Sequence, residues 1–402
     1  MRIKLFDYQT KALEGLPKDT YLAWETGTGK SLAGLEHFNR YNAMGDLVIV
    51  APASKVREKG WEREISRCYE NPPKFTVISY DMFRKKWEQI VSSDTTIIFD
   101  EAHFLANPTS LRSKASIKAS RVAHQFILLS ATPSPNGWQS SATYAIMTDF
   151  RRNKTDFWTN HVIVDRSRGF PLIMGYRQEK QLEKWWSSWV SPLKRTGDLV
   201  LPSQNLAINM PMTATEQKRF KTAIKERVLD DELLDTSGKL FATLRQIPVK
   251  SRIEALKTVL DGTGEHVVIF YNFNSERDAI LAMLEKSYKD LEVYEQSGHA
   301  SNLPAREKWQ SMKPSVTLAQ YQSGSAAIEL TYASVTVYFS PTTSYSNYEQ
   351  SKGRTLRHGQ DKTALFYHIN VEKSLDKKQY DALRNKKDFS TDLFNITIDN
   401  YK

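Results

Sequence analysis

The sequence has almost no cysteine: Cys68 is the only one among 402 residues. A single cysteine cannot form a disulfide within the chain, and it cannot supply a zinc site built from several thiolates. We therefore expect a reducing, intracellular environment. Cys68 itself is interpreted as a small, partly buried apolar residue.

Long apolar runs are also missing. No stretch approaches the roughly 18 consecutive apolar residues that a membrane-spanning helix needs. Residues 1–7 contain no apolar region of the kind found in signal peptides. The sequence therefore predicts a cytoplasmic protein with no membrane partner.

Acidic residues are fewer than basic ones. The chain has 46 Asp and Glu against 56 Lys and Arg, a formal net charge of +10. An excess of positive charge favours a polyanionic partner, but many basic proteins bind no nucleic acid, so charge alone leaves the partner open. With 40% apolar and 25% charged residues, the composition is that of a globular protein, and the length predicts two or three domains.

Short apolar segments alternate with longer amphipathic segments, which predicts parallel sheets flanked by helices, an α/β fold. Strands are expected at 20–24, 47–51, 76–80, 96–100 and 125–130, and again at 266–271, 292–296, 315–320, 335–339 and 364–369. Helices are expected at 30–41, 54–68, 82–91, 111–123, 275–286, 304–311 and 344–356. The repeated rhythm predicts two lobes, at 1–135 and 205–402, joined by a mostly helical, Trp-rich region at 136–204.

Three tryptophans lie close together in this connecting region, at Trp185, Trp186 and Trp189. At helical spacing such a cluster indicates packing within a core or between lobes. A platform on which nucleic-acid bases stack is the alternative interpretation.

Residues 25–31, Glu-Thr-Gly-Thr-Gly-Lys-Ser, follow the first expected strand and precede an amphipathic helix. A triphosphate needs backbone N–H donors close to its oxygens, and Gly27 and Gly29 permit that approach. The helix adds the positive end of its dipole. Lys30 can reach the β and γ phosphates, and the Ser31 hydroxyl can bind Mg²⁺. The strict phosphate-loop pattern requires glycine where Trp24 stands, so only the inner part of the pattern is met.

A second motif, Asp100-Glu101-Ala102-His103, ends an apolar strand. The carboxyl end of a strand is where an α/β sheet presents its ligand site. Asp100 is placed to hold Mg²⁺, Glu101 to orient and deprotonate an attacking water, and His103 to connect the site to the next segment. Residues 130–132, Ser-Ala-Thr, end the following strand, and their hydroxyls can hydrogen-bond to the acidic motif.

In this order, the motifs resemble the first lobe of a superfamily 2 helicase. Further segments narrow the resemblance to its Swi/Snf-type translocases. Residues 5–9 resemble the adenine-recognition motif, with Gln9 as the reader. Residues 48–54 with 61–65 resemble the first DNA-contact motif, and residues 78–83 resemble the next shared segment.

The second lobe carries the most specific match. In residues 350–360, Gln350 is followed by Arg354 and Arg357 and then by Gly-Gln. A helix would show both arginines on one face, and the resemblance implies that they reach the γ-phosphate. Two departures stand out: Glu329 replaces an asparagine of the family pattern, and residues 24–28 differ from the usual first motif. So compact a chain resembles the phage or bacterial members of the family.

The resemblance implies two tandem RecA-like lobes, with ATP and Mg²⁺ bound in the cleft between them and DNA, preferably duplex, as the partner. The residues it implies for catalysis are Lys30, Asp100, Glu101, Arg354 and Arg357; for ATP, Gln9, Thr26, Gly27, Thr28, Gly29, Lys30, Ser31 and Gln350; for Mg²⁺, Ser31 and Asp100; and for DNA, Ser54, Lys55, Arg57, Ser79, Tyr80 and Ser323. We expect a motor that hydrolyses ATP to translocate on DNA. A strand-separating helicase, an RNA-dependent ATPase and a non-enzymatic nucleic-acid-binding module with an inactive ATPase fold remain alternatives.

Overall fold

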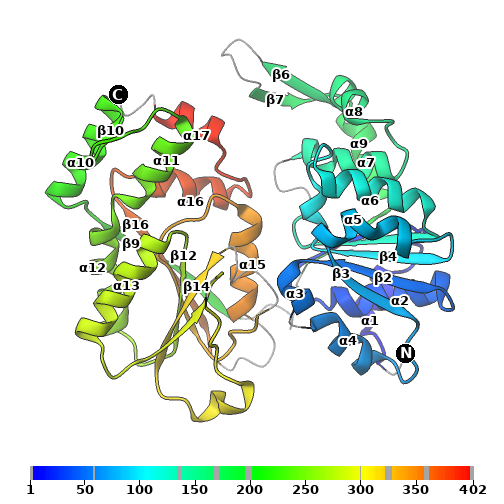
Figure 1. Cartoon of the computed structure of the whole chain (residues 1–402), viewed down its shortest axis with the longest axis horizontal. Helices are drawn as coiled ribbons and strands as arrows, with labels where there is room; N and C mark the ends of the chain where they lie inside the picture. The colour runs from blue at the N-terminus through cyan, green and yellow to red at the C-terminus, as the bar shows by residue number, and fades with distance from the viewer. Residues whose placement is uncertain are drawn as a thin grey trace. The chain divides into compact units, whose positions relative to one another are not determined.

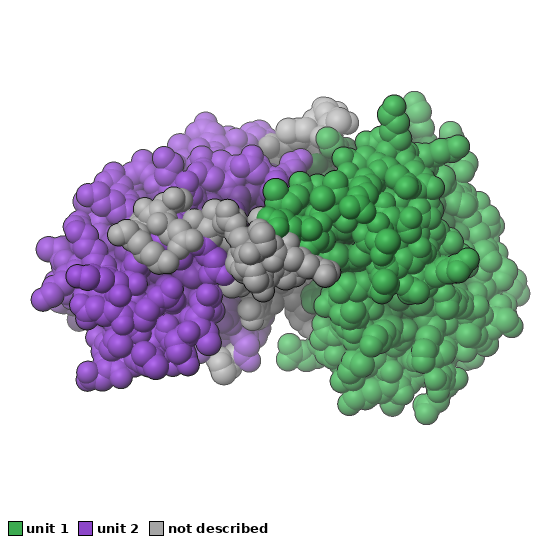
Figure 2. Space-filling view, turned by 90° about the horizontal axis from the view of Figure 1, so that it is seen from above, with its two compact units in different colours: residues 1–199 green, residues 200–402 purple. Residues whose placement is uncertain are grey.

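The computed structural model describes residues 3–57, 59–133, 137–165, 172–194, 202–298, 300–321, 328–356 and 362–398. The chain divides into two compact units, residues 1–199 and 200–402 (Figure 2). Each unit contains a six-stranded sheet (Figure 1).

Unit 1 alternates strands and helices. Its elements are α1 (Asp7–Ala12), β1 (Thr20–Trp24), α2 (Lys30–Asn42), β2 (Asp46–Ala51), α3 (Ala53–Arg57), α4 (Gly60–Cys68), β3 (Phe75–Ser79), α5 (Tyr80–Ile90), β4 (Thr95–Asp100), η1 (Ala102–Leu105), α6 (Leu111–Val122), β5 (Gln125–Leu129), η2 (Trp138–Ser141), α7 (Ala142–Met147), α8 (Lys154–His161), β6 (Val162–Asp165), β7 (Leu172–Tyr176), α9 (Glu179–Ser187) and β8 (Val190–Leu193). The main sheet has the order β3-β2-β4-β5-β1-β8, and all its pairs are parallel.

Both faces of the unit 1 sheet are covered, which explains the near-continuous apolar strands. Along β4, Ile97 and Phe99 point to one core cluster and Ile98 to the other. Side chains of α2 and α4 pack on the face of Ile98, and side chains of α5, α6 and α7 pack on the opposite face. Alternate residues of each strand are therefore buried on opposite sides of one sheet.

Unit 2 repeats the alternation. Its elements are β9 (Ser203–Met210), α10 (Ala214–Glu226), β10 (Val228–Leu229), β11 (Glu232–Leu233), α11 (Ser237–Gln246), α12 (Val249–Asp261), β12 (Val267–Tyr271), α13 (Asn274–Ser287), β13 (Glu292–Gln296), η4 (Arg306–Ser311), β14 (Ser315–Gln320), β15 (Val335–Tyr338), α15 (Tyr345–Thr355), β16 (Ala364–Val371), α16 (Asp376–Arg384) and α17 (Thr391–Ile398). The sheet has the order β13-β14-β12-β15-β16-β9 with parallel pairs throughout. The predicted fold class, two α/β lobes built on parallel sheets, is confirmed.

The connecting region differs from the prediction. Residues 137–194 are part of unit 1 rather than a separate segment, because β8 pairs with β1 in the main sheet, with Trp24 opposite Leu193. Helices α7, α8 and α9 hold more of its described residues than its strands do, and the region also contains the antiparallel β6–β7 ribbon. Trp185 and Trp189 are 9% and 4% exposed and join the core cluster that covers one face of the sheet. The packing interpretation of the Trp cluster is confirmed.

Candidate functional site

The predicted site segments of unit 1 meet at one edge of its sheet. Asp100 lies opposite Leu129, and Leu129 lies opposite Leu22, so the three form one row across β4, β5 and β1. All of these strands are parallel, so their carboxyl ends point the same way, and β1 ends two residues beyond this row. With roughly 4.8 Å between neighbouring strands, the phosphate-binding loop and Asp100 are separated by about two strand widths. This edge is where α/β sheets bind ligands.

The loop that precedes α2 has the backbone shape expected of an anion cradle. Gly27 and Gly29 adopt left-handed backbone conformations, with φ of 80° and 82°. Residues other than glycine rarely adopt such a conformation. Gly29 is the N-cap of the 13-residue helix α2 and brings no capping side chain to its first turn. The Lys30 Nζ donates to the backbone oxygens of Trp24 (2.8 Å) and Glu25 (3.3 Å). The lysine therefore lies over the loop that it is predicted to complete.

Gln9 is buried against this loop rather than facing solvent. Its side chain is 1% exposed, and its Nε2 donates to the backbone oxygen of Thr28 at 2.9 Å. Its Oε1 accepts from the backbone N–H of Phe6, which caps α1. A Cβ atom on Gly29 would lie 2.2 Å from the Gln9 Nε2. Gln9, predicted to read adenine, thus packs directly against the loop predicted to bind phosphate.

Asp100 is held by two donors that the sequence did not predict as its partners. One carboxylate oxygen, Oδ2, accepts from the Lys55 Nζ at 2.5 Å and from the Trp61 Nε1 at 2.8 Å. The Asp100 side chain is 2% exposed and that of Lys55 is 21% exposed. A lysine predicted to contact DNA therefore pairs with a carboxylate predicted to hold Mg²⁺.

Glu101 adopts a left-handed backbone conformation, with φ of 54°, which is unfavourable for a residue with a Cβ atom. Two buried tyrosines flank it. Tyr80 donates its hydroxyl to the backbone oxygen of Asp100, and Tyr144 donates to that of Ala102, both at 2.9 Å. Burial raises the pKa of both tyrosines, with the charge of Asp100 adding to the shift at Tyr80. Both hydroxyls consequently remain donors at neutral pH and fix the turn that aims the Glu101 carboxylate.

His103 connects the acidic motif to the end of the next strand. Its Nδ1 lies 3.4 Å from the Glu101 Oε2 and 3.1 Å from the Ser130 Oγ. The Ser130 Oγ also accepts from the backbone N–H of Thr132 at 3.1 Å. The structure thus brings together the three groups that the sequence predicted to communicate.

The residues predicted to contact DNA differ in how exposed they are. Tyr80 is only 3% exposed, with its hydroxyl bonded to a backbone oxygen, so its prediction as a DNA contact is corrected to a role in supporting the acidic motif. Ser79 is the N-cap of α5 and accepts from the Met82 N–H at 3.3 Å, while Arg57 is exposed on α3. Ser323 and the side chain of Ser54 lie outside the part of the chain that the structure describes.

In unit 2, Gln350 and Arg354 lie one helical turn apart on α15, with exposures of 6% and 7%. The helix ends at Thr355, and its C-cap Leu356 has non-helical angles (φ −99°, ψ 89°). The expectation that both arginines lie on one face of a helix stays a prediction, because the described part of α15 includes only Arg354. Arg357 itself lies outside the described residues.

Two residues of the site were missed from the sequence. Trp61 belongs to a segment matched by resemblance, but nothing in the pattern indicates that its indole N–H reaches Asp100. Tyr144 comes from the region predicted to connect the lobes, and no local signal links it to the acidic motif. Among the described residues, no cluster of three or more His, Cys, Asp or Glu side chains could hold a metal ion by itself. No described helix is long and apolar enough to cross a membrane.

Comparison with known proteins supports the resemblance in part of the sequence. A Caenorhabditis elegans SWI/SNF-related matrix-associated actin-dependent regulator of chromatin subfamily A-like protein 1 homolog is 31% identical over 153 residues, covering 32% of this chain and 22% of that protein. The Xenopus laevis SWI/SNF-related matrix-associated actin-dependent regulator of chromatin subfamily A-like protein 1 is 32% identical over 129 residues. The match covers 28% of this chain and 13% of that protein. The chain thus spans about a fifth of the first relative's length. No protein-family model matches the chain.

Two solved structures are loosely similar. A Sulfolobus solfataricus SWI2/SNF2 ATPase core in complex with dsDNA covers 98% of this chain and 92% of its own, with 18% identity and a TM-score of 0.42. The C-terminal part of the Fun30 ATPase domain covers 50% and 97%, with 15% identity and a TM-score of 0.42. Because these likenesses are loose, the family resemblance depends on the motifs and the sequence relatives. On those grounds the predicted resemblance is confirmed: the chain is similar to Swi/Snf-related proteins.

Proposed function

We propose that this chain hydrolyses ATP and uses the energy to translocate on DNA, with duplex DNA as the preferred track. The observation that carries the proposal is the convergence, at one sheet edge, of the glycine loop with Lys30 and of the acidic pair Asp100 and Glu101. A phosphate cradle beside two carboxylates is the arrangement that nucleoside triphosphate hydrolysis requires.

The residues present fit Mg²⁺ and ATP. The first turn of α2 follows two left-handed glycines and has no capping side chain at its N-cap, Gly29, and the start of a helix favours an anion. Mg²⁺ is usually held by one or two protein groups plus phosphate oxygens rather than by a full protein cage, and we propose Ser31 and Asp100 as those groups. Bound Mg²⁺ would neutralise charge that develops on the transferred phosphate.

The chain's own residues supply the remaining steps. We propose that Lys30 leaves the backbone oxygens of β1 to bind the phosphates and that Glu101, fixed by its flanking tyrosines, accepts a proton from the attacking water. The resemblance assigns Arg354 and Arg357 to the γ-phosphate, where an arginine is worth roughly 10³–10⁵ in rate. Arg354→Ala is accordingly expected to abolish hydrolysis and to leave nucleotide binding by unit 1 intact.

DNA is proposed as the track from the resemblance, from the net charge of +10, and from Lys55 and Arg57 on α3 at the same sheet edge. Contacts with the phosphate backbone predict little sequence preference and a steep dependence on salt.

The deciding experiment is steady-state ATP hydrolysis at low salt with no nucleic acid, single-stranded DNA, duplex DNA or RNA. The wild type would be compared with Lys30→Ala, which lacks the phosphate ligand, and with Glu101→Gln, which retains binding but lacks the base. Stimulation by duplex DNA in the wild type alone would support the proposal. Preferential stimulation by single strands or RNA would favour a strand-separating or RNA-dependent enzyme, and DNA binding without any hydrolysis would favour an inactive binding module.

A further inference from the structure

The pairing of Lys55 with Asp100 places a cation where the proposed function requires a metal. The Lys55 Nζ lies 2.5 Å from the Asp100 Oδ2, and the carboxylate is 2% exposed. Little water therefore screens the pair, and the lysine neutralises the negative charge that would attract Mg²⁺. A divalent ion bound beside this carboxylate would be repelled by the ammonium group at close range. Lysine and metal consequently compete for Asp100.

The Lys55 side chain can also reach the solvent-exposed surface of α3. It lies on the short helix α3, which also carries the exposed Arg57, and its own side chain is 21% exposed. A lysine is a compact charge on a flexible four-carbon stem, so rotation about that stem can carry the ammonium group from Asp100 to the surface of α3. A phosphate of a nucleic acid lying against α3 would receive it there.

Trp61 lets the carboxylate keep one donor when the lysine leaves. The Trp61 Nε1 donates to the same oxygen at 2.8 Å, and Trp61 is 2% exposed. Unlike Lys55, this donor carries no charge and does not oppose a metal ion. Asp100 thus has a fixed neutral partner and an exchangeable charged one.

We propose that Lys55 links the two ligands of unit 1: it pairs with Asp100 in the absence of nucleotide and with a nucleic-acid phosphate when Mg²⁺-nucleotide occupies the site. The inference rests on the proposed function and adds a mechanism for its regulation. Nucleic acid on α3 withdraws the competing cation and so tightens Mg²⁺-nucleotide binding. By thermodynamic reciprocity, Mg²⁺-nucleotide tightens nucleic-acid binding by the same factor.

The test uses the full chain and a fluorescent ADP analogue, whose dissociation constant is measured with Mg²⁺ or EDTA and with or without a short duplex DNA. Lys55→Met removes the exchangeable cation and retains much of the side-chain volume. Lys59→Met, at the exposed N-cap of α4, is the matched control for loss of a lysine. Trp61→Phe removes the neutral donor and leaves the Lys55 charge in place.

With Mg²⁺ and no DNA, Lys55→Met is expected to bind the ADP analogue about tenfold more tightly than the wild type, within the 5–150-fold range of typical coupling. Lys59→Met and Trp61→Phe should show no such gain, and in EDTA the advantage of Lys55→Met should shrink. DNA should tighten nucleotide binding by the wild type but not by Lys55→Met. With Mg²⁺-nucleotide bound, the plot of log DNA affinity against log salt concentration should be steeper for the wild type than for Lys55→Met. The slopes should differ by about one, the contribution of one lysine–phosphate contact.

A purely structural ion pair predicts the opposite sign. Loss of Lys55 would then leave Asp100 buried without its counter-charge and would weaken nucleotide binding, or leave it unchanged. Either result, with DNA coupling retained in Lys55→Met, would overturn the inference while leaving the proposed function intact. If the wild type bound no Mg²⁺-nucleotide at all, and Lys30→Ala behaved identically, the proposed function itself would fail and the inference with it.

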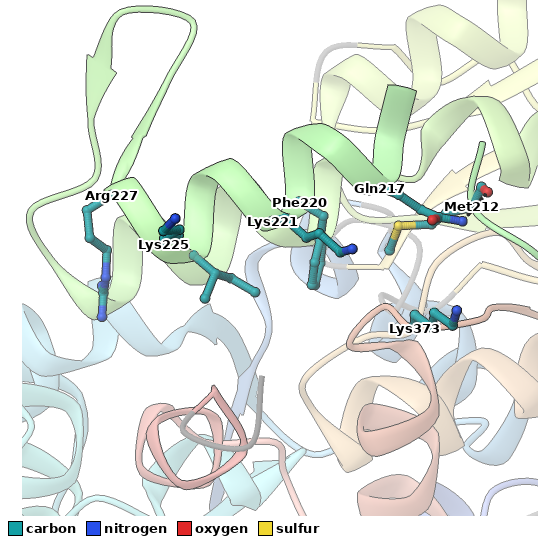
Figure 3. A pocket seen from close by; sticks show the side chains of 8 residues that line it. Met212, Gln217, Phe220, Lys221, Lys225, Arg227 and Lys373 are labelled. Atoms are coloured by element: carbon teal, nitrogen blue, oxygen red, sulfur yellow. Dashed lines mark hydrogen bonds between the residues drawn. The ribbon is translucent and has the colours of Figure 1, made fainter. Parts of the chain in front are cut away.

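A second inference comes from a groove in unit 2, independent of the nucleotide site. The groove has a volume of about 930 Å³ and runs along α10. In Figure 3 the labelled side chains follow the length of α10, with Arg227 at one end of the row and Met212 and Lys373 near the other. The apolar side chains of Met212, Phe220 and Ile224 line its floor.

The charged residues that line this groove are all cationic, namely Lys221, Lys225, Arg227 and Lys373, and Gln217 is its neutral polar residue; no acidic side chain lines the groove among the described residues. None of the four forms an ion pair with another residue in the described part of the chain, whereas Arg219, on the same helix, pairs with Asp230. A phosphate backbone would use the rim but would leave the apolar floor without a partner. The combination is complementary to a segment that carries both carboxylates and apolar side chains.

We infer that the groove docks an acidic amphipathic segment of a partner protein. The probe is a labelled helical peptide of about 16 residues, roughly 24 Å long, with Leu on one face and Glu on the other. Lys221→Glu/Lys225→Glu is expected to weaken its binding at least tenfold by charge reversal. Lys218→Glu, on the same helix but outside the groove, should leave affinity unchanged.

A Leu-to-Ser version of the peptide separates docking from simple charge attraction and is expected to bind at least tenfold more weakly. Equal binding of the two peptides, or no binding of either, would overturn the inference. If short duplex DNA competed with the peptide and lost affinity with the same double variant, the groove would instead be a nucleic-acid surface.

Discussion

Replacing Arg252 by methionine is expected to destabilise unit 2 strongly. Arg252 is fully buried between two buried carboxylates, with its guanidinium 3.2 Å from the Glu276 Oε1 and 2.6 Å from the Asp376 Oδ1. These residues come from α12, α13 and α16, so the arginine ties three helices together. Without it, two carboxylates would share a dry interior, with the buried Arg245 as a cation that interacts with both. Removing one partner of a buried ion pair costs about 3–5 kcal/mol.

For a unit of this size, 1 kcal/mol shifts the melting temperature by about 2–4 °C, so the variant should melt roughly 6–20 °C below the wild type. Thermal unfolding followed by circular dichroism would measure the shift, and nucleotide binding by unit 1 would show that its site persists. Lys257→Met is the matched control, because Lys257 pairs with Glu254 on the exposed surface of the same helix, where such pairs contribute less than about 1 kcal/mol. An Arg252→Met protein within about 1 kcal/mol of the wild type would refute the reasoning.

Three further predictions concern single contacts. Gly29→Ala should abolish nucleotide binding without unfolding the chain, because it places a Cβ 2.2 Å from the Gln9 Nε2 at a φ of 82°; Gly238→Ala, which meets no atom within 4 Å, should be silent in the same binding assay. Tyr144→Phe removes the donor to the Ala102 oxygen and should lower kcat for ATP about tenfold, equivalent to roughly 1.4 kcal/mol, with little change in KM; an unchanged kcat would exclude a role in aiming Glu101. Burial lowers the pKa of His368 from 6.5 to about 4. Between these two pH values the histidine is protonated in the unfolded chain and neutral in the folded chain. The free energy of unfolding should therefore fall by up to roughly 3 kcal/mol as the pH is lowered from 6.5 to 4. His368→Gln should flatten that part of the pH profile in denaturant titrations, and an unaltered slope would contradict the assignment.

The central strands could be predicted from the sequence because they are covered on both faces. β1 and β14 match their predicted ranges, and β4 differs by one residue, since continuous apolar runs bounded by polar residues leave little choice. The edge strands β8 and β9 were not predicted. β8 contains Pro192, which an edge strand tolerates, and β9 alternates exposed and half-buried residues without the apolar run that marks an interior strand.

The arrangement of the candidate site was predictable where it depends on backbone geometry. The glycines, Lys30 and the acidic pair follow from their position at strand ends, and the structure places them at one sheet edge. Contacts of long side chains were not predictable. Lys55 pairs with Asp100, and Tyr144 donates to the Ala102 oxygen across 42 residues of sequence. Both contacts depend on three-dimensional packing, which produces no recognisable pattern in the sequence.

The pairing of β8 with β1 determines where unit 1 can be cut. Residues 190–193, near the end of unit 1 in sequence, form β8 and pair with β1, the strand before the glycine loop. Next to this pairing, the Thr20 Oγ1 donates to the Trp189 backbone oxygen. A fragment ending near residue 135 would present β1 as an open edge and would remove Trp185 and Trp189 from the core. Expression of unit 1 alone should therefore yield soluble protein only when the fragment reaches at least Leu193. During synthesis the nucleotide loop would likewise stay unsupported until nearly half of the chain has emerged, because contacts between distant parts of a chain form late.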